Sequence, residues 1–188
     1  MQELQSGDLE DLGHIHLVLE GNSAAFGKLV TKYEKLIYKL AYNFLGKNAE
    51  IEDTVQEIFL EIYKSLGNFK LGRKFLPWLY AIALNVLRKK YKHLIRQKQI
   101  RESFARAPLP EVNSPEAIVE EKETRRQVRQ AIAALPANLR EVTLLFYMED
   151  LNVKEICDIL GLGTENVKSR LFRARKKLKK MLLDVQLE

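Results

Sequence analysis

The sequence predicts an all-α protein with two small helical domains joined by a flexible linker, the C-terminal domain being a helix-turn-helix. Apolar residues recur at helical spacing in both halves of the chain, and no stretch alternates as a strand would. A segment with three prolines and little periodicity, residues 105–117, separates the halves. We therefore expect one domain at 12–96, the linker at 97–119 and the second domain at 120–184.

Three helices account for the N-terminal domain. The first begins after Asn22 or Ser23, either of which can cap it, and Gly46 marks its end. Its apolar positions are Phe26, Leu29, Val30, Tyr33, Leu36, Ile37, Leu40, Ala41 and Phe44. The second helix covers residues 50–66, and its apolar face consists of Ile51, Val55, Ile58, Phe59 and Ile62. The third begins near Pro77, because proline suits the first turn of a helix, where its missing N–H is not needed.

Four helices are expected in the C-terminal domain, at 117–134, 138–149, 152–160 and 164–183. Gly161 can end the third in a left-handed conformation at little steric cost, and Gly163 or Thr164 can cap the fourth. Cys157 supplies a small, buried side chain where the two last helices must cross closely. Two helices joined by a short turn that contains glycine are typical of a helix-turn-helix.

Charge is concentrated rather than spread evenly. The chain has 31 Lys and Arg against 25 Asp and Glu, a net charge of +6. Residues 1–20 hold five acids and no Lys or Arg, whereas residues 168–180 hold eight basic residues and no acid. Such asymmetry indicates a localised nucleic-acid surface, the alternative being a solvated helix face.

Several classes of protein are disfavoured. No run of about 18 apolar residues occurs, so no transmembrane helix is expected, and the N-terminus lacks the features of a signal peptide. We therefore expect a cytoplasmic protein. The single cysteine, Cys157, disfavours an internal disulfide or a cysteine-rich zinc site. His14 and His16 point to different sides of a helix and form no ligand set with His93. No catalytic residue, metal or cofactor is expected.

The last helix offers a candidate surface for duplex DNA. Its apolar stripe, which faces the core, consists of Val167, Leu171, Ala174, Leu178 and Leu182. Away from this stripe lie Ser169, Phe172, Arg173, Lys176 and Lys180. Short polar residues near the start of a helix, followed by Lys and Arg, are typical of a recognition helix that reads base edges and then contacts phosphates. For Phe172 the alternative is packing against helix 138–149.

The N-terminal domain offers two further candidate surfaces. On the second helix, Leu60 lies opposite the apolar face with Asp53, Gln56 and Glu57 around it, which indicates a partner surface or a solvated acidic face. Near the third helix, aromatic and basic residues alternate, which suits single-stranded DNA because bases stack on rings while cations follow phosphates. These residues are Phe69, Lys70, Arg73, Lys74, Phe75, Trp78 and Tyr80. Core packing is the alternative for Trp78.

Two segments resemble a known family. ALPANLREVTLLFYMEDLNVKEICDILGLGTENVKSRLFRARKKL looks like the sigma-factor domain that reads the −35 promoter element. EDTVQEIFLEIYKSLGNFK, followed by KFLPWLYAIALNVLRKK, looks like the domain that binds core RNA polymerase and the −10 element. The opening LVLEGNSAAFGKLVTKYEKLIY is similar to the family's first helix. Because the extra domains of larger sigma factors are lacking, the chain resembles the extracytoplasmic-function (ECF) group of the sigma-70 family.

The resemblance implies a protein that binds the clamp helices of the largest polymerase subunit, recognises −35 and −10 elements and helps to melt DNA. The implied polymerase contacts are Asp53, Gln56, Glu57 and Leu60. The implied −10 contacts are Phe69, Lys70, Arg73, Lys74, Phe75, Trp78, Tyr80, Asn85 and Arg88. The implied −35 contacts are Glu165, Asn166, Lys168, Ser169, Phe172, Arg173 and Lys176. An anti-sigma factor, often membrane-anchored in this family, is a further expected partner.

The chain departs from the family pattern in three places. Pro77 stands where the family usually has a small or polar residue, and Lys89 where many members have an acid. Glu165 and Asn166 replace the common Gly-Thr pair at the start of the recognition helix. The first two departures bear on −10 preference. The third bears on −35 preference, because a carboxylate there favours cytosine or repels phosphate.

Two other classes of function remain open. A free-standing helix-turn-helix repressor or activator would dimerise, bind duplex DNA alone and need neither the surface around Leu60 nor the loop beside Trp78. A helical adaptor would bind only protein, so a titration with DNA would give a flat response that does not change with salt concentration. Phosphate contacts, in contrast, make the affinity for DNA depend steeply on salt concentration.

Overall fold

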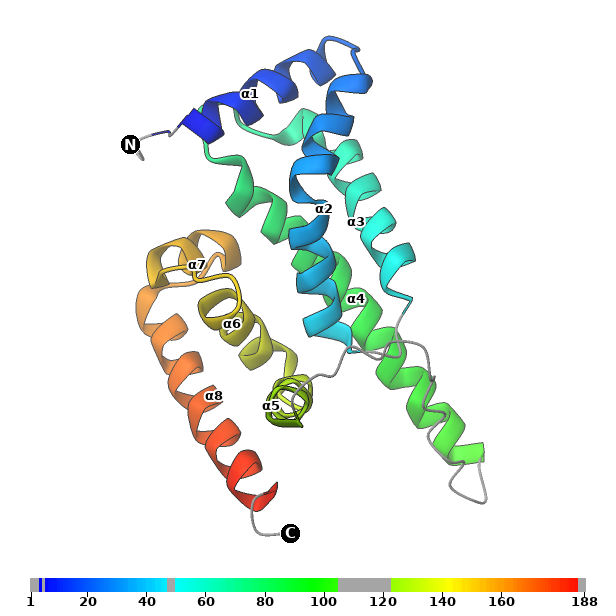
Figure 1. Ribbon diagram of the computed structural model, residues 1–188, viewed down its shortest axis with the longest axis vertical. Helices are drawn as coiled ribbons and strands as arrows, with labels where there is room; N and C mark the ends of the chain where they lie inside the picture. Colours follow the sequence, from blue (N-terminus) through cyan, green and yellow to red (C-terminus); the bar gives the residue numbers. More distant parts are fainter. Residues whose placement is uncertain (1–3, 5, 47–49, 105–122, 186–188) are drawn as a thin grey trace.

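The computed structural model describes residues 4, 6–46, 50–104 and 123–185, and within these ranges it contains helices and no strand. In chain order the elements are α1 (Ser6–Leu19), α2 (Ala24–Leu45), α3 (Ile51–Ser65), the short 3-10 helix η1 (Leu66–Asn68), α4 (Phe75–Phe104), α5 (Glu123–Ala133), α6 (Ala137–Tyr147), α7 (Val153–Leu160) and α8 (Thr164–Val185). Figure 1 shows α1–α4 as one group, the N-terminal bundle, and α5–α8 as a second, the C-terminal bundle. The predicted all-α fold class is confirmed.

Helices α2, α3 and α4 form the core of the N-terminal bundle because each has one apolar face. On α2, Leu29, Ile37 and Phe44 are almost fully buried, and on α3 Ile58 and Ile62 are fully buried. These are the faces that helical periodicity predicts. α4 begins just before the position expected, with a proline in its first turn as predicted.

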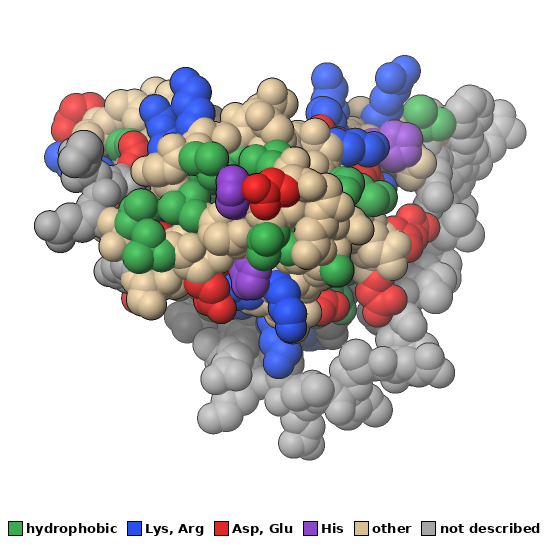
Figure 2. All heavy atoms as spheres, turned by 90° about the horizontal axis from the view of Figure 1, so that it is seen from above, with side chains coloured by type: hydrophobic (Ala, Val, Ile, Leu, Met, Phe, Trp, Pro, Cys, Tyr) green, Lys and Arg blue, Asp and Glu red, His purple; other side chains and the backbone are tan. Residues whose placement is uncertain are grey.

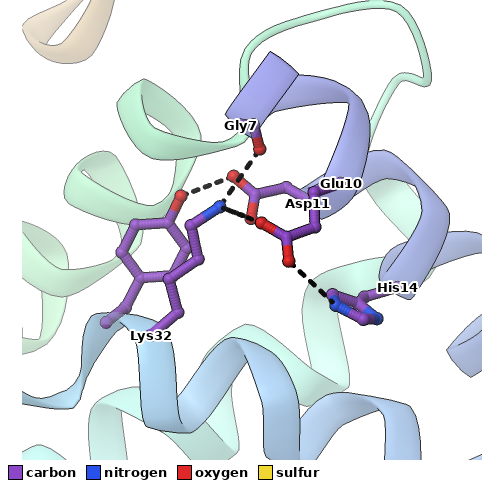
Figure 3. A network of polar contacts seen from close by, with 6 residues as sticks. Gly7, Glu10, Asp11, His14 and Lys32 are labelled. Carbon is purple, nitrogen blue, oxygen red and sulfur yellow. Dashed lines mark hydrogen bonds and ion pairs between the residues drawn. The ribbon is translucent and has the colours of Figure 1, made fainter.

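Helix α1 lies across the end of this bundle and is held by a buried carboxylate (Figures 1 and 3). Asp11 is 1% exposed and accepts hydrogen bonds from the Tyr33 hydroxyl and the Lys32 ammonium group of α2, each at 2.5 Å. Burial and the nearby Asp11 raise the pKa of Tyr33 above its ordinary value, so the hydroxyl stays protonated and donates. A buried charge needs such partners to offset its desolvation.

The C-terminal bundle contains the predicted helix-turn-helix. Asn152 caps α7 through a capping box, in which its side chain accepts from the Glu155 amide at 3.1 Å and the Glu155 carboxylate accepts from the Asn152 amide at 2.9 Å. Gly161 ends α7 with φ 64°, in the left-handed region where glycine carries no steric cost. Cys157 is partly buried near the crossing, with its sulfur 3.9 Å from the Thr164 hydroxyl.

The linker begins later than the sequence predicts. α4 continues to Phe104, past residue 97, because no glycine or proline interrupts the polar, helix-forming residues that follow its apolar part. Residues 105–122 lie outside the described residues, and so does the first part of the helix expected at 117–134.

The two bundles are docked on each other. α7 packs on α4, while α5 and α6 pack on α2. Buried apolar residues from both bundles belong to one continuous core. The sequence predicts two tethered domains, so this docking is an additional finding.

Candidate nucleic-acid interface

Helix α8 presents a polar and basic face to solvent. Val167 and Leu171 anchor it in the core at 0% and 4% exposure, as its apolar stripe predicts. Phe172 is 68% exposed, so its alternative placement against α6 is wrong. The other predicted duplex-DNA contacts are also exposed, namely Glu165, Asn166, Lys168, Ser169, Arg173 and Lys176. The residues expected to contact duplex DNA therefore share one solvent-facing side of α8.

The first turn of α8 carries a negative charge close to a positive one. The Glu165 side chain is 89% exposed and lies 3.1 Å from the Lys168 ammonium group. The Arg170 guanidinium donates to the Asn166 side-chain oxygen at 3.0 Å. A carboxylate is stabilised at a helix N-terminus by the helix dipole. Glu165 is thus placed as an accepting group at the leading end of the helix.

A second surface is a pocket of about 1180 Å³ between η1 and the start of α4. Its lining includes Phe69, Lys70, Arg73, Lys74, Pro77 and Trp78, together with Asp158 from α7, and we call it the aromatic pocket. Three rings meet at this pocket. Trp78 is partly buried and packs on Phe69, with ring centroids 5.2 Å apart, and on Phe75 at 5.7 Å. Trp78 therefore packs partly on the core, as its alternative placement predicts, and one part of it also lines the pocket.

Three of the predicted single-strand contacts lie deeper than expected. Phe69, Phe75 and Tyr80 are 6%, 1% and 1% exposed. Phe69 and Phe75 pack on each other and on Trp78, whereas the Tyr80 hydroxyl donates to Glu149, so these three rings offer bases little surface for stacking. Helical periodicity does not separate a ring under the surface from one on it.

Along α4, the next predicted contacts are already engaged within the protein. Arg88 donates to both carboxylate oxygens of Glu141 on α6, from Nε at 2.6 Å and from Nη2 at 2.9 Å. Its Nη1 donates to the Asn85 side-chain oxygen at 2.6 Å. The hydrogen bonds to Glu141 raise the pKa of Arg88 above its usual value, so the guanidinium group stays charged.

The exposed side of α3 carries the acidic patch, which consists of Asp53, Gln56, Glu57 and Leu60. Leu60 is 58% exposed, and the other three side chains are also exposed. Glu57 pairs with Lys90 of α4 at 2.9 Å, and this hydrogen bond raises the pKa of Lys90. An exposed leucine among acids, with a cation on one flank, has the make-up of a protein-binding surface.

Sequence reasoning missed the charged residues between the bundles. Arg140 of α6 is 0% exposed, donates to the Phe44 carbonyl of α2 at 2.7 Å, and lies 4.1 Å over the Tyr91 ring of α4. Glu149 accepts from the Tyr80 hydroxyl at 2.9 Å. We call this set of contacts the seam, formed by Lys39, Tyr80, Arg88, Arg140, Glu141 and Glu149. The available signal was charge inside an apolar stretch, LREVTLLFYMED.

The end of the molecule formed by α1 has a different character. Leu9, Leu17 and Leu19 are exposed there. Figure 2 shows hydrophobic side chains in several groups on this face, with His, Asp and Glu between them and Lys and Arg mainly at the edges. Among the described residues, no three His, Cys, Asp or Glu side chains are placed to hold a metal ion, and no helix is both long and apolar enough to span a membrane.

Two family models match this chain, one to each bundle. The model of sigma-70 region 2 matches residues 29–98, which begin in the second turn of α2 and end within α4. The model of sigma-70 region 4 matches residues 125–178, which contain the helix-turn-helix.

Known proteins are similar over almost the whole chain. The ECF RNA polymerase sigma factor SigW of Bacillus subtilis is 33% identical over 91% of this chain and 96% of its own. The ECF RNA polymerase sigma-E factor of Escherichia coli K12 is 30% identical over 91% and 93%, respectively.

Solved structures share the fold. CnrH, in complex with the cytosolic domain of CnrY, has a TM-score of 0.67 and 26% identity, covering 94% of this chain and 98% of that one. The sigma factor RpoE of Bartonella quintana, in complex with the anti-sigma factor NepR, has a TM-score of 0.63 over 84% of this chain and 96% of that one. Its 20% identity makes this a likeness of fold.

Proposed function

The chain belongs to the ECF sigma factors of the sigma-70 family, and from this premise we propose how its residues divide the work of promoter recognition. A sigma factor lends promoter recognition to RNA polymerase at transcription initiation. One observation supports the division of labour: the models of region 2 and region 4 match separate bundles, in that order along the chain, and each bundle has an exposed surface suited to nucleic acid. Domain boundaries follow as α1–α4 for the first region and α5–α8 for the second.

The acidic patch on α3 is proposed as the docking surface for the clamp helices of the polymerase. It combines an apolar centre, Leu60, with the polar rim that protein interfaces have. It lies on α3, which contributes none of the residues that line the aromatic pocket and none of the basic face of α8. Polymerase and DNA therefore occupy separate surfaces of one chain.

The aromatic pocket and the adjoining face of α4 are proposed to hold the −10 strand. A base taken out of the stack can lie against Trp78, while Lys70 and Arg73 contact the backbone on either side. Asn85 and Arg88 continue the path along α4. Phe69 and Phe75 have a supporting role, because they fix the position of the Trp78 ring from below.

The exposed face of α8 is proposed to read the −35 element in the major groove.

Replacing Arg173 and Lys176 by alanine should lower the slope of log affinity against log salt for −35 duplex DNA by about 1 per residue, because each phosphate contact releases counterions. Fluorescence anisotropy over a potassium chloride series with the holoenzyme measures this slope. Glu165→Ala is the matched contrast: it should relax preference at one base pair and leave the slope unreduced. An unchanged slope in the double variant contradicts the phosphate contacts.

A regulatory partner is proposed on the basis of the structural relatives. RpoE of Bartonella quintana was solved with the anti-sigma factor NepR. We propose that an anti-sigma factor also binds this chain and retains it in the cytoplasm or at a membrane until it is released. Purification from native, non-induced cells without such a protein counts against this partner. No catalytic step is assigned to the chain, because the polymerase carries out RNA synthesis.

Mixing the purified protein with bacterial core RNA polymerase tests the proposal as a whole. We expect a stoichiometric complex on gel filtration, and transcription from a cognate promoter that core polymerase alone does not support. Tight binding of the isolated protein to duplex DNA, with no polymerase complex, would instead establish a free-standing helix-turn-helix regulator. Free protein should bind promoter DNA weakly, because two tethered DNA contacts reinforce each other only when their spacing is set.

A further inference from the structure

We propose that the C-terminal bundle closes the −10 surface of the free protein, with carboxylates of the C-terminal bundle occupying the positions that −10 phosphates take in the promoter complex. This inference rests on the proposed −10 role of α4 and the aromatic pocket. It concerns a contact within this chain and requires no anti-sigma factor.

The geometry at Arg88 is that of an occupied anion site. Its guanidinium donates two hydrogen bonds to Glu141, at 2.6 and 2.9 Å, which is the two-pronged arrangement that guanidinium groups form with carboxylates and phosphates alike. The Glu141 side chain is 4% exposed. Since one guanidinium edge cannot hold two anions, a DNA phosphate reaches this edge of Arg88 only after Glu141 has left.

The same pattern recurs on either side of this pair. Glu149 is 5% exposed, accepts from the Tyr80 hydroxyl at 2.9 Å and lies 3.5 Å from the Lys39 ammonium group. Burial and Glu149 together raise the pKa of Tyr80, so its hydroxyl remains a donor. Asp158 of α7 lines the aromatic pocket together with Arg73 and Lys74. Glu141 and Asp158 of the C-terminal bundle therefore lie on the path proposed for the strand, and Glu149 adds a further acidic contact between the bundles.

The contact between the bundles combines buried apolar residues with the polar seam. The side chains of Arg140, Glu141 and Glu149 gain access to water when the bundles separate, which lowers the cost of opening. A buried ion pair adds little net stability because desolvation offsets its attraction, yet it defines one docking geometry. Interfaces between domains of this kind resemble transient protein interfaces. The contacts thus give a defined closed state without fusing the two bundles permanently.

Closure links DNA binding to the arrangement of the bundles. A −10 strand that binds only the open state must shift the protein towards it, and a polymerase that holds the bundles apart must strengthen −10 binding by the same factor. The measured affinity of the free protein is lowered by the fraction that is open. The weak DNA binding expected of free protein then has a second, local cause.

Two variants test the closure in the full-length chain. Glu141→Gln keeps the size of the side chain and removes its charge. Lys39→Gln alters a half-exposed residue that belongs to no proposed DNA contact, so it serves if the first variant folds poorly. Spin labels at exposed Lys28 on α2 and Lys179 on α8, in a Cys157→Ser background, report the separation of the bundles by pulsed electron paramagnetic resonance.

We expect one short inter-label distance in the wild type and a growing long-distance population in each variant and on adding a −10 non-template oligonucleotide. Each variant should bind that oligonucleotide about tenfold more tightly than wild type, because less of the protein is closed. Glu34→Gln, which removes an exposed acid outside the seam, should behave as wild type. Folded variants with unchanged distances and unchanged affinity overturn the closure.

Holoenzyme experiments separate this inference from the function on which it rests. Wild-type holoenzyme should bind forked promoter DNA in a manner that depends on Trp78, whether or not the free protein closes. If it does so while the free variants show no opening, the closure is wrong and the −10 assignment stands. If the holoenzyme does not bind the forked DNA, the −10 assignment is wrong. The proposal that carboxylates replace −10 phosphates is then wrong as well, because it depends on that assignment.

Discussion

Replacing Trp78 by alanine should leave binding to core RNA polymerase intact and remove most of the strand opening. Trp78 lines the aromatic pocket and rests on Phe69 and Phe75, so its ring is held in place for a base that leaves the duplex. Stacking of a base on an aromatic ring contributes about 1–3 kcal/mol. We therefore expect the equilibrium constant for open-complex formation to fall by about fivefold to 150-fold, with the acidic patch unaffected.

Permanganate reactivity of unpaired thymines in the promoter measures the opening, and gel filtration measures the polymerase complex. Trp78→Phe is the control, because it keeps a ring on the same two neighbours and should retain part of the opening. Pre-melted promoter DNA should reduce the defect of Trp78→Ala, since part of the unpairing cost is then absent. A folded Trp78→Ala protein that no longer binds polymerase contradicts the proposed division between α3 and α4.

Most helices of this protein are predictable because their apolar residues recur with helical period and their ends carry glycine, proline or a capping residue. The helix-turn-helix is the clearest example: Asn152 and Glu155 form a capping box at the start of α7, and Gly161 takes a positive φ at its end. Helical periodicity also predicts which side of α8 faces solvent, and the exposed Phe172 lies on that side. Local signals of this kind require no knowledge of the tertiary contacts.

Helix α1 shows where such reasoning fails. Its buried positions include the charged Asp11, whereas Leu9, Leu17 and Leu19 are exposed. The hydrophobic pattern therefore gives almost no periodic signal. Ile15 and Val18 pack α1 on the core, while the pairing of Asp11 with Lys32 and Tyr33 fixes its position across two helices. A pairing between distant residues leaves no mark on local sequence.

The candidate site was predictable in composition but not in depth. Sequence reasoning placed Phe69, Phe75 and Trp78 together, yet only the packing shows that two of these rings lie beneath the third. The seam was not predictable at all, because Glu141 and Arg88 are 53 residues apart in the chain. On a helical wheel, a charged residue on the apolar face looks the same whether it is buried with a partner or simply interrupts that face. Only the partner, which lies far away in the sequence, distinguishes the two cases.

The largest loss of polymerase binding is expected from the triple change Asp53→Ala, Gln56→Ala and Leu60→Ala. A few central hot-spot residues of a protein interface each cost about 2 kcal/mol or more when truncated to alanine, and we expect Leu60 to be one of them. The triple variant should therefore bind core polymerase at least about a hundredfold more weakly. All three side chains are exposed, so their truncation leaves the core of the N-terminal bundle unchanged.

Glu57 is best changed separately, because it also pairs with Lys90 of α4 at 2.9 Å and its loss affects the fold as well as the surface. Titration of fluorescently labelled protein against core polymerase measures the affinity, and Glu34→Ala on α2 is the control for loss of an exposed acid. The triple variant alone should still bind duplex DNA as weakly as wild type does, with the same salt slope, because α8 is untouched. Lost transcription with unchanged DNA binding then locates the defect at the polymerase. A triple variant that binds polymerase normally would move the docking surface away from α3 and leave Leu60 as an isolated exposed leucine.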